Sequence, residues 1–199
     1  MTGTNSFAAE DFDGLTKINT SAFGGFCRAR KLKIDPAHGI DPDQTVGQGL
    51  AALYLARDMP AFFRVMAYAL PVRESVWLAC LAGAQMLPEG AEQTEALKAA
   101  QAWVYKPNED TRKAVEKAIK EADFDDPTVL AADAAFHGMA KGLEDVVHSP
   151  PTASPTMVFA MLLKAAMRDG DAAKADANWQ ELVGYSLNIA AGGTGKNDG

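Results

Sequence analysis

Apolar positions recur every three or four residues along most of the chain after residue 40. This spacing places apolar side chains on one face of an α-helix, and the same stretches are rich in residues that favour helices. Alternation of apolar and polar residues, which would indicate strands, is rare. The pattern predicts eight helices, over residues 43–57, 59–69, 72–87, 90–105, 109–122, 127–139, 155–168 and 172–190.

Helix starts are marked by residues that can cap them. An Asp or Ser followed closely by Pro occurs at Asp41, Asp58, Asp126 and Ser154, and Asn108 is a further candidate. Such a side chain accepts a hydrogen bond from an unpaired N–H of the first turn. Proline in that turn loses no hydrogen bond. Each of these residues is therefore predicted to begin a helix.

The chain divides into three parts. Residues 1–40 form an N-terminal irregular segment broken by glycines, in which 20–26 is interpreted as a loop or short extended piece. Residues 41–192 form the helical domain and 193–199 a flexible tail. The long loop 138–153 is either a functional excursion or a tether between two sub-bundles. We predict an all-α fold, a compact bundle of about seven to eight helices, in preference to a helical repeat array.

Charge excludes some function classes. The chain has 19 Lys and Arg against 26 Asp and Glu, a net charge of −7, which argues against nucleic acid as a partner. The one basic cluster, Arg28–Lys33, is interpreted as a solvated strand or loop, with a contact for an acidic partner or phosphate as the alternative. The longest apolar run is Met157–Leu163, too short to span a membrane. With no signal-peptide pattern, we expect a cytoplasmic protein.

Motifs for metals, cofactors and catalysis are missing from the sequence. Three histidines and two cysteines, without metal-ligand spacing, predict neither a metal nor a cofactor. The acidic stretch Asp123–Asp126 is interpreted as a loop and a helix cap, because it lacks the glycine and distal glutamate of a calcium loop. The Gly192–Lys196 stretch lacks residues that a phosphate-binding loop needs. Ser149 beside His148 does not make a catalytic triad.

An Arg-Glu pair opens the helix predicted at 72–87. The helix dipole favours Glu74 in the first turn but not Arg73. Arg73 is therefore predicted to bind a carboxylate or backbone carbonyls of a neighbouring helix. Such a contact would lock the helices 59–69 and 72–87 together, and a surface recognition site is the alternative. Trp77, in the same helix, is predicted to lie in the core.

The stretch Ala69–Cys80 resembles the motif of an uncharacterised family of bacterial all-helical proteins. That motif reads Leu-Pro, a basic residue, then Arg-Glu-Ala-Val-Trp-Trp-Ala, and this chain departs from it at Leu78. Ala102-Trp103 also fits the family layout, and the likeness spans about 45–192. The resemblance implies an all-helical fold and an accessory or adaptor role near bacterial secretion systems.

Elimination and surplus apolar surface favour a non-enzymatic protein that binds another protein. The Met-rich run Met157–Met167 can adapt to partners, and the expected groove lies beside the helix 155–168 or around Arg73 and Glu74. A homo-oligomer is compatible with this. The rival is a small-molecule-binding protein or enzyme with a pocket in the bundle, using Arg73, Glu74 and His137. The candidate interaction or structural residues are Arg73, Glu74, Trp77, Trp103, Met157 and Met161.

Overall fold

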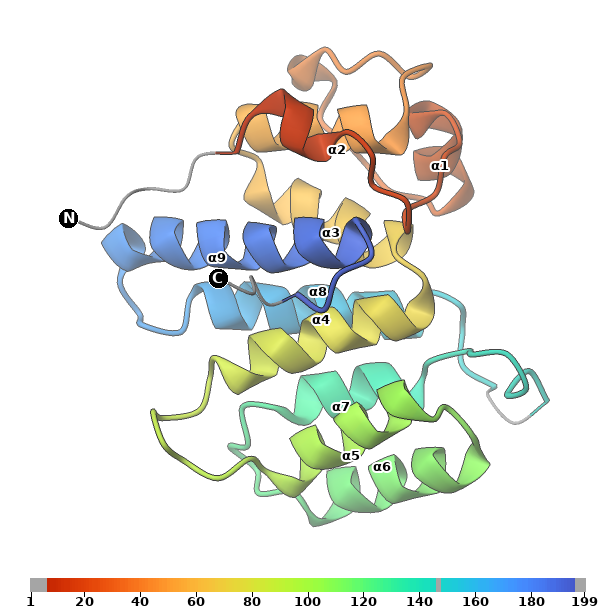
Figure 1. The fold of residues 1–199 in the computed structure, drawn as a ribbon, viewed down its shortest axis with the longest axis vertical. Helices are drawn as coiled ribbons and strands as arrows, with labels where there is room; N and C mark the ends of the chain where they lie inside the picture. Colours follow the sequence, from red (N-terminus) through yellow and green to blue (C-terminus); the bar gives the residue numbers. More distant parts are fainter. Residues whose placement is uncertain (1–6, 146–147, 196–199) are drawn as a thin grey trace.

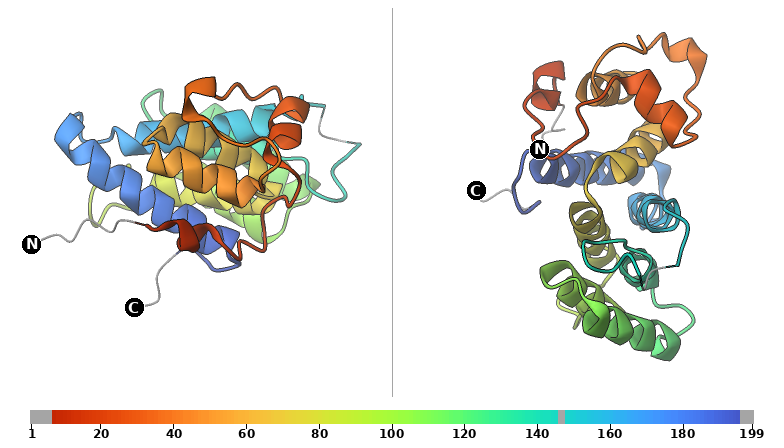
Figure 2. Two further views of the ribbon diagram at one scale, coloured as in Figure 1. Left: turned by 90° about the horizontal axis from the view of Figure 1, so that it is seen from above. Right: turned by 90° about the vertical axis from the view of Figure 1, so that its right-hand side faces the viewer.

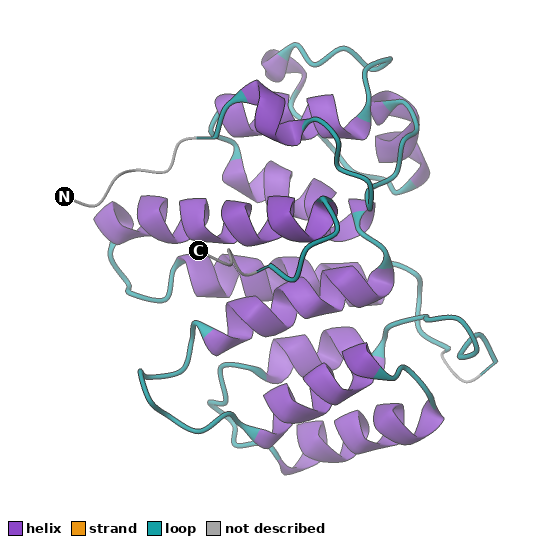
Figure 3. Ribbon diagram, viewed as in Figure 1, coloured by secondary structure: helices purple, strands orange, loops and turns teal. Residues whose placement is uncertain are grey.

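The computed structural model describes residues 7–145 and 148–195, and regular structure in that part of the chain is helical (Figure 3). Two short 3₁₀ helices are present there, at Ala9–Phe12 and Pro36–His38. The α-helices are α1 (Phe23–Ala29), α2 (Val46–Leu55), α3 (Met59–Ala69), α4 (Val72–Ala84), α5 (Glu95–Tyr105), α6 (Glu109–Glu121), α7 (Val129–Phe136), α8 (Ala153–Ala166) and α9 (Ala172–Ala190). The all-α prediction is confirmed.

The helices stack along the long axis of the molecule. α1 and α2 lie at one end, α5 and α6 at the other, and α4 and α8 in between (Figure 1). α8 packs against α3, α4, α7 and α9, so it ties together both halves of the stack. Figure 2 shows the same order from the side, with α6 farthest from α1.

α4 is the central buried helix that its sequence predicts. Val76, Leu78, Ala79 and Cys80 have no exposed surface, because α5, α7, α8 and α9 surround the helix. Small side chains on α4 and α7 let these backbones approach closely, and the alanines of α7 are fully buried at positions 131, 132, 134 and 135. The helix ends at Ala84, three residues before the predicted end.

The N-terminal segment is part of the core. The interpretation of residues 20–26 as a loop or extended piece holds for 20–22, where Ala22 forms a β-bridge with Thr45, and is wrong for 23–26. α1 begins at Phe23, and its Phe26 is 1% exposed. Phe12 packs its ring 5.5 Å from that of Tyr54 and 6.1 Å from that of Phe62. The segment therefore completes the apolar face of α2 and α3 instead of standing apart from the bundle.

Some predicted caps are confirmed and others are wrong. The Asp58 carboxylate accepts from Ala61 N at 3.0 Å, and Asn108 accepts from Thr111 N at 2.9 Å. Asp41 does not cap α2, which Thr45 caps through Gln48 N instead. Asp126 accepts from Thr128 N in a turn before α7, and Ser154 lies inside α8. Of the four Asp or Ser residues followed closely by Pro, Asp58 alone caps a helix in the described structure, because the same pair also favours turns.

The loop between α7 and α8 is not a tether between sub-bundles. The two helices pack directly on each other, and Leu143 of the loop is 1% exposed. Gly138, at the start of the loop, lies against the indole of Trp103: a Cβ there would meet the ring at 2.6 Å. The described part of this loop therefore folds onto the bundle, while residues 146–147 lie outside the described part.

The chain folds back on itself after α9. Trp77 Nε1 donates to Thr194 O at 2.7 Å, and Gly195 N donates to the Asn188 side chain at 2.7 Å. Residues 193–195, predicted as the start of a flexible tail, are thus docked, and 196–199 lie outside the described residues. Within the described residues, the helices are all too short or too polar to cross a bilayer.

Candidate functional site

Arg73 and Glu74 hold α4 to other parts of the chain, but not to α3 as the sequence predicts. Arg73 Nε donates to Val104 O, in the last turn of α5, at 3.0 Å. Glu74 lies 3.7 Å from the ammonium of Lys17, in the N-terminal segment. The pair therefore joins α4 to α5 and to residue 17, and a lock between α3 and α4 is not what these side chains form.

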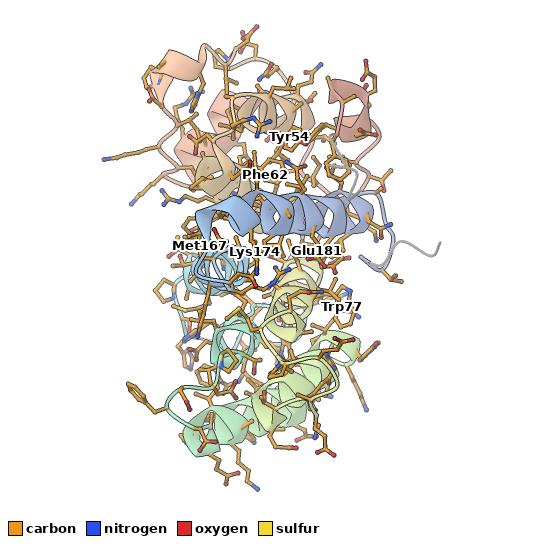
Figure 4. All side chains as sticks on the ribbon, turned by 90° about the vertical axis from the view of Figure 1, so that its left-hand side faces the viewer. Tyr54, Phe62, Trp77, Met167, Lys174 and Glu181 are labelled. Carbon is orange, nitrogen blue, oxygen red and sulfur yellow. The ribbon has the colours of Figure 1, made fainter. Side chains whose placement is uncertain are left out.

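Trp77 is half-buried, whereas the prediction put it in the core. Figure 4 labels Trp77 on α4. Its ring lies 6.1 Å from that of Tyr105, which is 74% exposed, and its Nε1 donates to the C-terminal segment. The indole N–H thus holds Thr194 against α4, and the ring of Tyr105 lies beside the indole. Trp77 does not line the cleft described below.

Trp103 and the methionines are mostly core residues. Trp103 and Met161 have no exposed surface, and Met157 is half-buried. Met167, at the end of α8, is 51% exposed. The Met-rich run therefore fills the centre of the bundle, and the apolar surplus that suggested a docking stripe along this helix is largely used in packing.

A cleft of about 390 Å³ lies at the start of α8. It opens where α1 and the end of α3 approach the first turns of α4 and α8 and the end of α7. Its walls are mostly apolar. The lining residues are Ala29, Arg30, Ala67, Tyr68, Leu70, Val72, Ser75, His137, Met139, Pro151, Thr152, Ser154 and Pro155.

The charged character of the cleft is basic. Arg30 and His137 line it together with hydroxyl residues, and none of the described residues lining it is acidic. The guanidinium of Arg30 lies 4.1 Å from the ring centre of Phe26, a contact that holds its plane in place. In the described part of the chain Arg30 forms no ion pair, so its N–H donors remain available.

Two helices begin at the cleft without side-chain caps. Val72 and Thr152 lie at the first turns of α4 and α8, and neither helix has a side-chain hydrogen bond to its first N–H groups. The positive end of a helix dipole favours negative charge nearby. Both helix ends therefore add to the preference for an anion that Arg30 creates.

His137 and Ser149 form a polar pair beside the cleft. His137 Nδ1 and the Ser149 hydroxyl are hydrogen-bonded, which ties the loop after α7 to the cleft wall. Burial raises the pKa of Asp133, one helical turn before His137, and His137 opposes the rise. Within the described residues no hydrogen bond joins the Asp133 carboxylate to the His137 ring, so a serine–histidine–carboxylate relay is not formed.

The sequence singles out only part of this site. Arg30 belongs to the cluster Arg28–Lys33, for which an acidic partner or phosphate was the alternative interpretation, and His137 was named in the rival hypothesis. Tyr68 and Thr152 carry no signal of their own. Groups of metal-binding side chains are not found among the described residues.

Comparison with known proteins now places the chain. A family model matches residues 49–190, more than half of the chain. The chain belongs to DUF6931, a family of unknown function. This match covers α3 to α9 and most of α2, so the expected membership in an uncharacterised family is confirmed, while α1 and Arg30 precede the matched region. Neither the curated proteins nor the solved structures include a significant match.

Proposed function

We propose that this DUF6931 protein is a non-enzymatic, cytoplasmic binding protein whose cleft takes an acidic, partly apolar segment of another protein. The observation that carries the proposal is the charge of the cleft. In a chain of net charge −7, the half-buried Arg30 has no ion pair in the described structure, and it lies in a cleft whose described lining has no acidic side chain.

The cleft walls argue for an apolar component in the ligand. Leu70, Val72 and Met139 line the cleft, and Met139 is 41% exposed although it is apolar. A purely polar ligand would leave these apolar walls in contact with water. An aliphatic or aromatic side chain would cover them, and burying apolar surface stabilises a complex by about 25 cal/mol per Å². Acidic and apolar residues together are therefore the chemistry that suits both parts of the cleft.

Selection from a displayed library of random peptides tests this function. We expect peptides selected on the wild-type protein to be rich in Asp or Glu next to an apolar residue. The variants Arg30→Gln and Arg30→Glu should fail to retain them, because a charge-assisted hydrogen bond contributes about 1.5–3 kcal/mol. Lys117→Gln, a change at a 73% exposed lysine on α6, is the matched control and should retain them.

The selection contradicts the proposal in two ways. Peptides without acidic residues would show that charge does not select the ligand. Acidic peptides that bind Arg30→Gln and the wild-type protein equally would place the binding surface outside the cleft. The role near bacterial secretion systems that the resemblance implies stays a prediction.

A small anionic molecule is the second candidate, and the volume of the cleft favours it. Cavities of about 300–1,000 Å³ are typical of small-molecule sites, and this cleft has about 390 Å³. Thermal unfolding with succinate or citrate tests this. Stabilisation of the wild-type protein but not of Arg30→Gln would support a small carboxylate ligand, and no shift with either compound would count against it.

A further inference from the structure

A single phenylalanine is fully exposed between α6 and α7. Phe124 has a relative exposure of 108%, and the acidic residues Asp123 and Asp125 on either side of it are also exposed. A single exposed apolar residue is common on protein surfaces, but aromatic side chains are enriched at protein–protein interfaces. We call residues 123–126 the Phe124 loop.

The Phe124 loop is held in a defined shape. Asp126 N donates to Asp123 O at 3.0 Å, which closes a turn with Phe124 at its tip. The Asp126 carboxylate accepts from both Thr128 N and the Thr128 hydroxyl, at 2.7 and 2.8 Å, and Thr128 is fully buried. Because the backbone of this turn is already ordered, the loop loses little backbone freedom when Phe124 binds a partner.

The Phe124 loop and the cleft lie at opposite ends of α7. The loop precedes Val129, the first residue of α7, and His137, which lines the cleft, follows its last residue. Figure 1 shows the two ends of α7 facing opposite sides of the molecule. Eight helical residues span about 12 Å, so the loop does not reach the cleft of its own chain.

We propose that the cleft binds the Phe124 loop of a second copy of this chain. Phe124 enters between the apolar walls, and the carboxylates of Asp123 and Asp125 meet Arg30. The loop combines one aromatic with exposed negative charge, and the cleft combines apolar walls with unpaired positive charge. This inference rests on the proposed function, since it names the occupant of the same cleft.

The contact joins two different surfaces, so it has consequences for assembly. A head-to-tail contact of this kind produces a ring or an open chain of copies, not a symmetric pair. One loop in one cleft buries little surface, and small interfaces are weak and transient. Self-association is therefore expected at high protein concentration and should weaken as salt is added.

Sedimentation velocity at increasing protein concentration tests the inference on the full chain. We expect the average mass of the wild-type protein to rise with concentration, and Phe124→Ser and Arg30→Gln each to stay monomeric. An equimolar mixture of the two variants should form dimers and nothing larger, because one supplies an intact cleft and the other an intact loop. Leu55→Ser removes another exposed apolar side chain, 62% exposed at the end of α2, and should associate as the wild type does.

Two results would overturn the inference. One is a wild-type protein that stays monomeric at every concentration. The other is association that persists in Phe124→Ser or is lost equally in Leu55→Ser. If acidic, apolar peptides are still selected by the cleft in either case, the proposed function stands and only the second copy is excluded as occupant. Circular dichroism of each variant confirms that it is folded.

Discussion

At the scale of single residues, the indole of Trp103 leaves no room for a side chain at position 138. A Cβ at position 138 would lie 2.6 Å from the Trp103 ring, which is fully buried and cannot move aside. We predict that Gly138→Ala lowers the free energy of unfolding by about 1–3 kcal/mol, the usual cost of overpacking. Urea unfolding of the variant and the wild type measures the difference.

Gly25 supplies the matched control for this substitution. It lies in α1, and a Cβ there would meet nothing within 4 Å. Gly25→Ala should stabilise the protein by about 0.5–1 kcal/mol, because alanine loses less backbone freedom than glycine in a helix. Equal effects at the two positions would contradict the steric explanation.

Arg73 is expected to matter for stability and not for binding. Arg73→Ala removes the hydrogen bond to Val104 O and should lower the free energy of unfolding by about 1 kcal/mol. Affinity for peptides selected on the cleft should be unchanged, since Arg73 does not line it. A variant of unchanged stability that loses its peptide would assign Arg73 to recognition instead.

Asp133 gives a pH-dependent prediction. Burial raises the pKa of this carboxyl above its unfolded value, although His137 opposes the shift. The ionised form is therefore disfavoured in the folded protein, and stability is lost as pH rises through the folded pKa. Asp133→Asn should be more stable than the wild type at neutral pH, and the gain should vanish below the ordinary pKa of Asp. Unfolding measured at both pH values checks this.

At the scale of helices, the sequence predicts helix bounds best where a capping residue, proline or glycine marks the ends of the helix. The predicted bounds 59–69 and 172–190 agree with α3 and α9, because Asp58 and Pro71 flank the first and Gly192-Gly193 follows the second. α1 is missed because Gly24 and Gly25 lie within it. A Cβ at Gly24 would lie 2.6 Å from Pro42 Cβ. Position 24 therefore needs glycine because residue 42 packs against it, and only the folded structure reveals this contact.

Helix capping can be tested at two residues that look alike in the sequence. Asp58 caps α3 and also bonds His38 Nε2 at 2.9 Å, whereas among the described residues the Asp41 carboxylate accepts from Asp43 N alone, in an exposed turn. Asp58→Ala should cost about 1–2 kcal/mol and Asp41→Ala a few tenths. Thermal unfolding of both variants measures this, and equal losses would contradict the assignment of the cap.

At the scale of the molecule, the candidate site is an assembly that no single stretch encodes. Arg30, Tyr68, His137 and Thr152 come from four distant segments and meet only after α1, α3, α7 and α8 have packed. The basic cluster around Arg30 is visible in the sequence, yet its role depends on which apolar walls fold beside it. The Arg-Glu motif, by contrast, is prominent in the sequence and serves to join helices.

The most direct test of the account is the affinity of the cleft for an acidic, apolar peptide. Fluorescence anisotropy of a labelled peptide from the library selection measures it for the wild type, Arg30→Gln and Lys117→Gln. We predict about a ten- to hundredfold loss for Arg30→Gln, little change for Lys117→Gln, and weaker wild-type binding at high salt. Equal affinity of Arg30→Gln and the wild type would contradict the central claim.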